Sequence, residues 1–264
     1  MPADLTSPRS ARVTEVRHLH DRRHRAQRGA FVVEGPQAVR EALGNAVLEL
    51  YLTEEAADRY PDFVERAGRV AIATEDVLAA MSETSHPQGV IAVCPLVTRP
   101  LEATLESLST SAPLLVVLDR VSDPGNAGTI IRTADAMGAD AVILTDGSVD
   151  PHNGKCVRST AGSIFHVPIC ADAPDDDVRT LLAHAGVPVV AADAHADACL
   201  DDARDLLRGP IAWVFGSEAH GVDPAWLASA QTTLRIPMTG GAESLNLAAS
   251  AAICLYATSR ARGT

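Results

Sequence analysis

Short apolar runs alternate with amphipathic segments along the first part of the chain. The apolar runs predict strands at residues 31–34, 47–52, 70–73 and 90–93. The segments between them predict helices at residues 10–21, 36–43, 54–67 and 74–81. Because strands and helices that alternate in this way form layered structures, this part is predicted to be a small α/β sandwich.

A segment containing Pro95, Pro100 and the serine- and threonine-rich residues 107–113 interrupts the pattern. Beyond it, strands are predicted at residues 114–118, 141–144, 165–168, 187–191, 211–215 and 233–236. Helices are predicted at residues 127–137, 155–161, 176–185 and 224–230, and a last, apolar helix runs to Ala257. This order indicates a mostly parallel sheet covered on both faces. We therefore expect an N-terminal domain at residues 1–98, a linker at 99–113 and a second domain at 114–264.

Polar loops that contain glycine follow three predicted strands of the second domain. They lie at residues 123–132, 215–222 and 237–246. Ligands of parallel sheets bind beyond the carboxyl ends of the strands, so the loops are expected to form one composite site. Taken singly, their residues have ordinary explanations: Asn126 fits a helix cap, Arg132 a surface cation, and Glu243 with Ser244 the start of the last helix. Only the combination of the three loops indicates a site.

Common nucleotide-binding and metal-binding patterns do not fit these loops. Gly125-Asn126-Ala127-Gly128 lacks the spacing of a dinucleotide-binding turn, and no Gly-Lys-Ser/Thr sequence indicates a phosphate-binding loop. Asp193, His195 and Asp197 could present three metal ligands, but nothing in the sequence fixes that geometry. A polar loop is the simpler interpretation, and no metal is expected.

The chain is acidic, with a formal net charge of -12. Nucleic-acid-binding domains are usually basic, which argues against indiscriminate binding of polyanions. Residues 9–28 are an exception, because seven arginines and three histidines lie there with only Glu15 and Asp21. This basic segment is either a surface that contacts nucleic acid or a solvated helix face, and the sequence leaves both interpretations open.

Cysteine usage and hydropathy indicate the compartment. The five cysteines are scattered without a Cys-x-x-Cys spacing, which indicates reduced thiols rather than a disulfide framework or a zinc site. No apolar segment follows the first residues, and the longest apolar runs, 112–118 and 247–257, are too short to cross a bilayer. We therefore expect a cytoplasmic protein without a membrane partner.

The three loops carry motifs in a fixed order. They are Asn126-x-Gly128-x-x-x-Arg132, then Phe215-Gly216-Ser217-Glu218-x-x-Gly221, then Ile236-Pro237-Met238 followed by Glu243-Ser244-Leu245-Asn246. From about residue 114 to the C-terminus, the chain thereby resembles the SpoU (TrmH-like) branch of the SPOUT RNA methyltransferases. Residues 31–35 and Gln88-Gly89-Val90 are similar, more loosely, to the small ribosomal-protein-like RNA-binding domain of many members.

The resemblance implies a fold and a reaction. The mostly parallel sheet would be threaded into a deep trefoil knot, a rare exception to unknotted topology. S-adenosylmethionine would bind in the knot and donate a methyl group to a ribose 2′-hydroxyl of structured RNA, with ribosomal RNA favoured over transfer RNA. Members are typically homodimers, and residues 247–257 would belong to that interface. The alternative is a non-catalytic RNA-binding or ribosome-assembly protein that keeps the fold.

The resemblance also implies roles for individual residues. Those expected at the cofactor are Gly216, Ile236, Met238 and Leu245. Those expected to be catalytic are Asn126, Arg132, Glu218, Ser244 and Asn246. Asn126, Ser244 and Asn246 would orient the ribose and the loop, and Glu218 would hold the second loop or contact RNA. Arg132 is either a base or a phosphate anchor, and we favour the anchor because a guanidinium stays protonated in proteins and is a poor base. Arg158 and Ser159 are secondary candidates on the RNA side, with a simple capped turn as the alternative.

Overall fold

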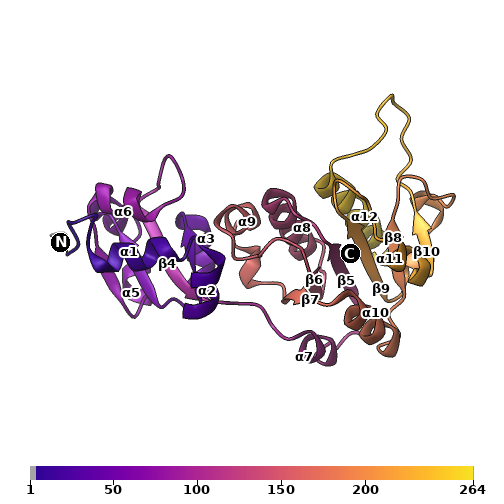
Figure 1. The fold of residues 1–264 in the computed structure, drawn as a ribbon, viewed down its shortest axis with the longest axis horizontal. Coiled ribbons are helices and arrows are strands. Elements are labelled where there is room, and N and C mark those ends of the chain that lie inside the picture. Colours follow the sequence, from indigo (N-terminus) through magenta and orange to yellow (C-terminus); the bar gives the residue numbers. More distant parts are fainter. Residues whose placement is uncertain (1–3, 264) are drawn as a thin grey trace. The chain divides into compact units, whose positions relative to one another are not determined.

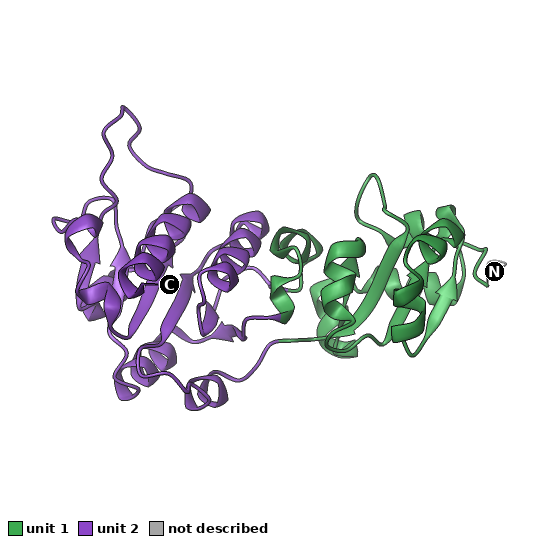
Figure 2. Ribbon diagram, turned by 180° about the vertical axis from the view of Figure 1, so that it is seen from behind, with its two compact units in different colours: residues 1–97, 152–165 green, residues 98–151, 166–264 purple. Residues whose placement is uncertain are grey.

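The computed structural model describes residues 4–263, so residues 1–3 and 264, at the two ends of the predicted domains, lie outside the described residues. The chain is divided between two compact units (Figure 2). The first contains the N-terminal residues up to Val97 together with His152–Phe165. The second contains Thr98–Pro151 together with the residues from His166 onward.

The sheet of the first unit has four strands in the order β1-β4-β2-β3. Their bounds are Ala30–Glu34 for β1, Glu49–Leu52 for β2, Val70–Ile72 for β3 and Val90–Pro95 for β4. β4 pairs antiparallel with β1 and β2, whereas β2 and β3 are parallel. Each strand lies where the apolar pattern predicted one, and Val16, Tyr51 and Met81 belong to the core beside the sheet.

The helix predicted at residues 54–67 is two helices, and the helix at residues 22–28, after the one predicted at 10–21, was not predicted. The helices are α1 (Ala11–His18), α2 (Arg22–Arg28), α3 (Pro36–Ala42), α4 (Glu54–Arg59), α5 (Pro61–Arg66) and α6 (Glu75–Met81). Asp21 starts α2 by accepting hydrogen bonds from the N–H groups of Arg23 and His24 at 2.9 and 3.2 Å. Tyr60 separates α4 from α5, because a residue before proline is disfavoured in the helical conformation.

Residues 152–165 complete the first unit. They contain α9 (Gly154–Thr160) and the 3₁₀ helix η1 (Ser163–Phe165). The buried ring of Phe31 packs against His152 and Phe165, with ring centroids 4.7 and 6.0 Å apart. The strand predicted at residues 165–168 is wrong. Phe165 is held in η1, Pro168 has no N–H for a sheet ladder, and the strand β7 begins only at Ile169.

The sheet of the second unit has six strands in the order β10-β8-β9-β5-β6-β7, and all five neighbouring pairs are parallel (Figure 1). The bounds are Leu114–Asp119 (β5), Ala141–Thr145 (β6), Ile169–Ala173 (β7), Val189–Ala192 (β8), Ile211–Gly216 (β9) and Thr232–Leu234 (β10). The predicted parallel α/β sheet is therefore confirmed.

Helices cover both faces of this sheet. They are α7 (Leu101–Glu106), α8 (Pro124–Ala136), α10 (Asp175–His184), α11 (Pro224–Ser229) and α12 (Leu247–Arg262), with short 3₁₀ helices η2 (Leu200–Asp202) and η3 (Leu206–Arg208). Leu101, Leu182 and Trp226, from α7, α10 and α11, share one core cluster with alternate residues of the strands. On the other face α8 and α12 lie side by side, and the indole N–H of Trp213 in β9 donates to Thr258 of α12 at 2.9 Å (Figure 1).

The last helix begins later than predicted. Glu243 and Ser244 were expected at its start, but both lie exposed in the preceding loop. Asn246 is the cap, because its Oδ1 accepts from the N–H groups of Ala248 and Ala249 at 2.9 and 3.2 Å. Within residues 4–263, α12 and the other helices are all too short or too polar to cross a membrane.

Candidate functional site

Three loops meet at the carboxyl end of the second unit's sheet. They follow β5, β9 and β10, in the parallel sheet where strand ends share an edge. The first loop runs into α8, which begins at Pro124 and is capped by Asp123, whose Oδ1 accepts from the N–H of Asn126 at 2.8 Å. Asn126 is therefore in the first turn of the helix rather than its cap, and its side chain is free to reach the other two loops.

A chain of side-chain hydrogen bonds joins the loops. The Asn126 amide donates to Glu218 Oε1 at 2.7 Å. The Asn246 amide donates to Asn126 Oδ1 at 3.1 Å, while Asn246 Oδ1 caps α12. One residue from each sequence motif thus takes part, so the rigid start of α12 and the β9–α11 loop are both tied to Asn126.

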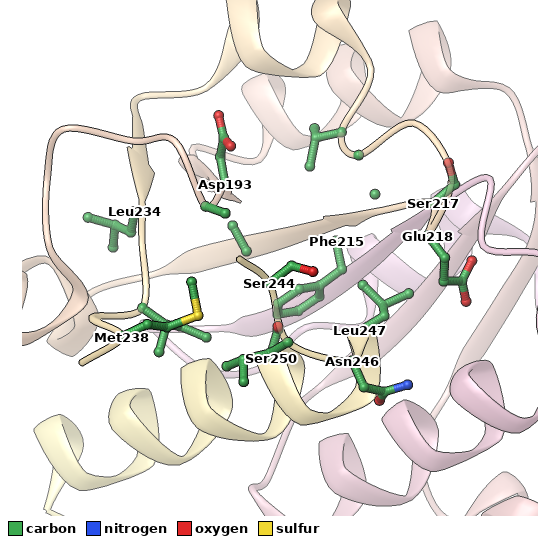
Figure 3. A pocket seen from close by; sticks show the side chains of 17 residues that line it. Asp193, Phe215, Ser217, Glu218, Leu234, Met238, Ser244, Asn246, Leu247 and Ser250 are labelled. Carbon is green, nitrogen blue, oxygen red and sulfur yellow. The ribbon is translucent and has the colours of Figure 1, made fainter. Parts of the chain in front are cut away.

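A cavity of about 490 Å³ lies beside this chain of hydrogen bonds (Figure 3). All four residues predicted to hold the cofactor line it: Gly216, Ile236, Met238 and Leu245. Glu218, Ser244 and Asn246, predicted to be catalytic, line it as well. The cavity therefore combines apolar walls with polar groups at one side, which is typical of a small-molecule site.

Gly216, the last residue of β9, has no room for a side chain. A Cβ atom there would lie 2.1 Å from the backbone carbon and oxygen of Gly221 and 2.2 Å from the nitrogen of Val222. The loop folds back because the Gly221 N–H donates to the Ser217 carbonyl at 2.9 Å. Backbone therefore forms this wall of the cavity, and a flat or extended ligand can approach it closely.

A buried carboxylate fixes the base of the same loop. Asp119, at the end of β5, is 1% exposed, and its Oδ2 accepts from the Asp223 N–H at 2.7 Å. Arg120 donates through Nε to Asp119 Oδ1 at 3.1 Å and also hydrogen-bonds the Asp223 carboxylate. Burial raises the pKa of Asp119, whereas the hydrogen bond from Arg120 lowers the pKa of Asp223. The sequence analysis missed these three residues, although a charged residue ending an apolar strand was a usable signal.

Arg132 stands apart from the cavity. It lies on α8, exposed, and is not among the residues that line the cavity. Within residues 4–263 it forms no hydrogen bond or ion pair with another side chain. Its guanidinium is therefore available to a ligand that extends beyond the cavity along α8.

The secondary candidates take part in contacts of the first unit. Arg158 Nη1 lies 3.3 Å from Glu34 Oε1 and 3.5 Å from Glu83 Oε2. Ser159 Oγ donates to the Lys155 carbonyl at 2.9 Å within α9. These contacts stabilise the fold of the unit and agree with the interpretation of a capped turn.

Part of the basic segment is structural. Arg25 is 3% exposed and donates to the carbonyl oxygens of Leu19 and His20 at 2.9 and 2.8 Å. Arg28 pairs with Glu15 and Glu49 at 3.0 and 3.1 Å. Other arginines are exposed, namely Arg9, Arg17, Arg22 and Arg23. The cationic surface formed by this segment is therefore smaller than the number of its arginines suggested.

The segment that contains Asp193, His195 and Asp197 begins with an ordinary turn. The His195 N–H donates to Asp193 Oδ1 at 2.9 Å. Over residues 4–263 the structure has no cluster of three or more His, Cys, Asp or Glu side chains arranged to bind a metal. Asp193 instead lines the cavity, together with Ser217 and Ser250, and the sequence analysis gave none of them that position.

Comparisons with known proteins agree with this geometry. Residues 113–256 match the SpoU rRNA Methylase family, and residues 10–92 match the MRM3-like substrate binding domain. The chain is 36% identical over 254 residues to the 23S rRNA (guanosine(2553)-2'-O)-methyltransferase RlmP of Bacillus subtilis, covering 96% of this chain and 97% of that protein.

Solved structures of similar proteins show the same fold over nearly the whole chain. The AdoMet-bound rRNA methyltransferase of Sinorhizobium meliloti superposes with a TM-score of 0.85 at 32% identity, covering 97% of both chains. The SpoU methyltransferase AviRb of Streptomyces viridochromogenes, in complex with AdoMet, gives a TM-score of 0.84 at 29% identity. That comparison covers 97% of this chain and 99% of the other.

Proposed function

The chain belongs to the SpoU rRNA methylase family, and from this premise we propose that it is an S-adenosylmethionine-dependent methyltransferase that methylates a ribose 2′-hydroxyl of ribosomal RNA. The observation that carries the proposal is the hydrogen-bonded chain Glu218–Asn126–Asn246 beside a cavity lined by the expected cofactor residues. It joins all three family motifs at one place.

The cavity fits the cofactor. Gly216, Gly221 and Val222 form one wall of the cavity, and Gly216 must be glycine because a Cβ atom there would collide with the backbone of Gly221. Ile236, Met238 and Leu245 offer apolar surface, and Met238 and Leu245 are 38% and 39% exposed. When bound, the cofactor supplies a methyl group already activated on a sulfonium. The protein then has mainly to align the hydroxyl and assist loss of its proton.

The polar residues of the three loops have different roles in aligning the hydroxyl and assisting loss of its proton. Asn126, Ser244 and Asn246 orient the ribose, and Glu218 holds the β9–α11 loop through Asn126. Arg132 grips the phosphate next to the target with two parallel hydrogen bonds and stabilises the developing oxyanion electrostatically. Its exposure and lack of side-chain partners in the described structure support a role in binding an external anion.

We also propose roles for the domains and an assembly, on the basis of the resemblance to the family. Residues 1–98 act as the RNA-binding domain and residues 114–264 as the methyltransferase domain with a trefoil knot, although residues 152–165 of the latter pack in the first unit. The predicted linker, 99–113, includes α7, which packs in the core of the second unit. The protein is a cytoplasmic homodimer, and Ile253 and Tyr256 of α12, 39% and 57% exposed, give its interface an apolar surface. The match to a substrate binding domain at residues 10–92 supports the first assignment.

Calorimetric titration with S-adenosylmethionine, followed by mapping of ribose methylation in ribosomal and transfer RNA of cells with and without the protein, tests the proposal. A single ribosomal site that is lost without the protein is the expected result. A methylation site lost from transfer RNA would show that transfer RNA, and not ribosomal RNA, is the substrate. Cofactor binding without any lost methylation would favour the alternative, a ribosome-assembly protein that keeps the fold.

A further inference from the structure

The cavity in the second unit has an uneven charge. Two carboxylates line it, Asp193 and Glu218, and the lining contains no lysine, arginine or histidine within the described part of the chain. Asp193 follows β8 and Glu218 follows β9, and the two lie on different sides of the cavity (Figure 3). A ligand between them is therefore exposed to negative potential from both sides.

Asp193 is held in place but keeps one carboxylate oxygen free. Its N–H donates to the Leu234 carbonyl at 3.1 Å, which fixes its backbone beside β10. Oδ1 accepts from the His195 N–H at 2.9 Å. Within residues 4–263, Oδ2 has no hydrogen-bond partner and no cation pairs with the group. The free oxygen belongs to a half-buried residue of the cavity wall, so its charge is only partly screened by solvent.

Glu218 adds a second negative charge that is not neutralised. Its partner is the side-chain amide of Asn126, at 2.7 Å, which is a neutral donor. The hydrogen bond orients the carboxylate and leaves its net charge unchanged. A ribose and an adenine are neutral groups and can be bound by neutral hydrogen-bonding partners. The two carboxylates of the cavity therefore provide negative charge that these groups do not need.

We infer that Asp193, with Glu218, makes the cavity select its cofactor by charge, so that it binds the methyl donor more tightly than the demethylated product. The inference rests on the proposed function. S-adenosylmethionine has a sulfonium, an ammonium and a carboxylate group, and so one net positive charge. S-adenosylhomocysteine has a neutral thioether in place of the sulfonium and no net charge. Transfer of the methyl group thus removes the charge that the two carboxylates attract, which favours release of the product.

The test compares the two ligands in calorimetric titrations of the full-length protein and of two variants. Asp193→Asn removes the charge but keeps the Oδ1 acceptor for the His195 N–H, so the turn is preserved. Asp197→Asn is the matched control, because it removes the same charge from an exposed residue of the same loop that does not line the cavity. Asp193→Asn should reduce the preference for donor over product by about 3- to 10-fold, while the control leaves it unchanged within about 2-fold.

A second measurement needs no variant. The preference of the unmodified protein for the donor should decrease between about 50 mM and about 500 mM NaCl, because salt screens charge–charge attraction. Equal weakening of donor and product by Asp193→Asn, or an unchanged ratio, would overturn the inference while leaving the proposed function intact. If the unmodified protein binds neither ligand, the proposed function is wrong and the inference with it.

Discussion

The side-chain amide of Asn246 donates to Oδ1 of Asn126, 120 positions earlier in the chain, at 3.1 Å. The same Asn126 donates to Glu218 at 2.7 Å. One small side chain thus sets the spacing of two loops whose other residues line the cavity. Asn126 itself is not part of the cavity lining, so removing its side chain takes away no surface that a bound cofactor would contact.

Asn126→Ala should therefore lower kcat more than it weakens cofactor binding. Loss of both hydrogen bonds lets the two loops move by a fraction of an ångström, and misplacement on that scale costs about 10- to 100-fold in rate. We expect the cofactor Kd to change by no more than about 2-fold. Single-turnover methylation and calorimetry measure the two quantities.

Thr133→Ala is the control for this experiment. Thr133 is on the same helix, and within the described part of the chain its hydroxyl hydrogen-bonds only the Thr129 carbonyl, at 2.9 Å. It should behave like the unmodified protein in both assays. Equal losses of cofactor affinity and rate in Asn126→Ala would contradict the role of Asn126 in spacing the loops.

Gly216→Ala should abolish cofactor binding. The new methyl group would overlap the backbone of Gly221, 2.1 Å away, so the β9–α11 loop must move and the cavity wall with it. Gly209→Ala is the matched control in the same unit, because a Cβ atom there meets the Leu206 carbonyl oxygen at an ordinary 3.6 Å. Calorimetry on both variants checks the prediction, and saturable binding by Gly216→Ala at unchanged affinity would show that the loop is not a rigid wall.

The sequence sufficed to predict the parallel sheet and the edge at which the three polar loops meet, because both follow from local signals. Apolar runs in the second unit locate its strands, and in a parallel sheet the residues after each strand share one edge. The assignment of Gly216, Leu245 and Asn246 to the cofactor and the ribose came from the resemblance to the family, and the cavity contains all three. The hydrogen bonds among Asn126, Glu218 and Asn246 depend on side-chain directions, which the order of the motifs does not contain.

Other features depend on packing between distant parts of the chain. Residues 152–165 join the first unit because Phe31 packs against His152 and Phe165. No local sequence pattern predicts this contact. The last helix starts after Asn246 because that side chain caps it, although Ser244 was an equally suitable cap by residue type. Tertiary contacts, rather than the local preferences of residue types, determine where the last helix starts and which unit residues 152–165 join.

Arg132→Lys should lower the rate of methylation by about 10-fold or more, because lysine cannot form two parallel hydrogen bonds to a phosphate. Stability should change by less than about 0.5 kcal/mol, since the residue is exposed and without side-chain partners in the described structure. Arg204→Lys, another exposed arginine of the second unit, is the control. Undiminished turnover by Arg132→Lys, measured with saturating RNA, would contradict the bidentate grip.

Glu49 of the first unit should make its stability depend on pH. Tyr51 donates to this carboxylate, and Arg12 and Arg28 donate to it at 3.2 and 3.1 Å. Burial by itself raises the pKa of Glu49, but these hydrogen bonds outweigh burial, so the pKa lies below its ordinary value. A carboxylate with a lowered pKa stabilises the folded state fully above its unfolded-state pKa, and that contribution is lost as the pH falls through the folded-state value.

Glu49→Gln should therefore reduce the free energy of unfolding by about 1–2 kcal/mol at pH 7, and by less at pH 4, below the ordinary carboxyl pKa, where the unfolded chain binds the proton more readily than the folded one. Urea denaturation followed by circular dichroism at the two pH values measures the difference. Glu55→Gln is the control, because Glu55 is 72% exposed in its pair with Arg59 and such pairs contribute little. If Glu49→Gln reduces the free energy of unfolding equally at both pH values, the side chain stabilises the unit through its shape and not through its charge.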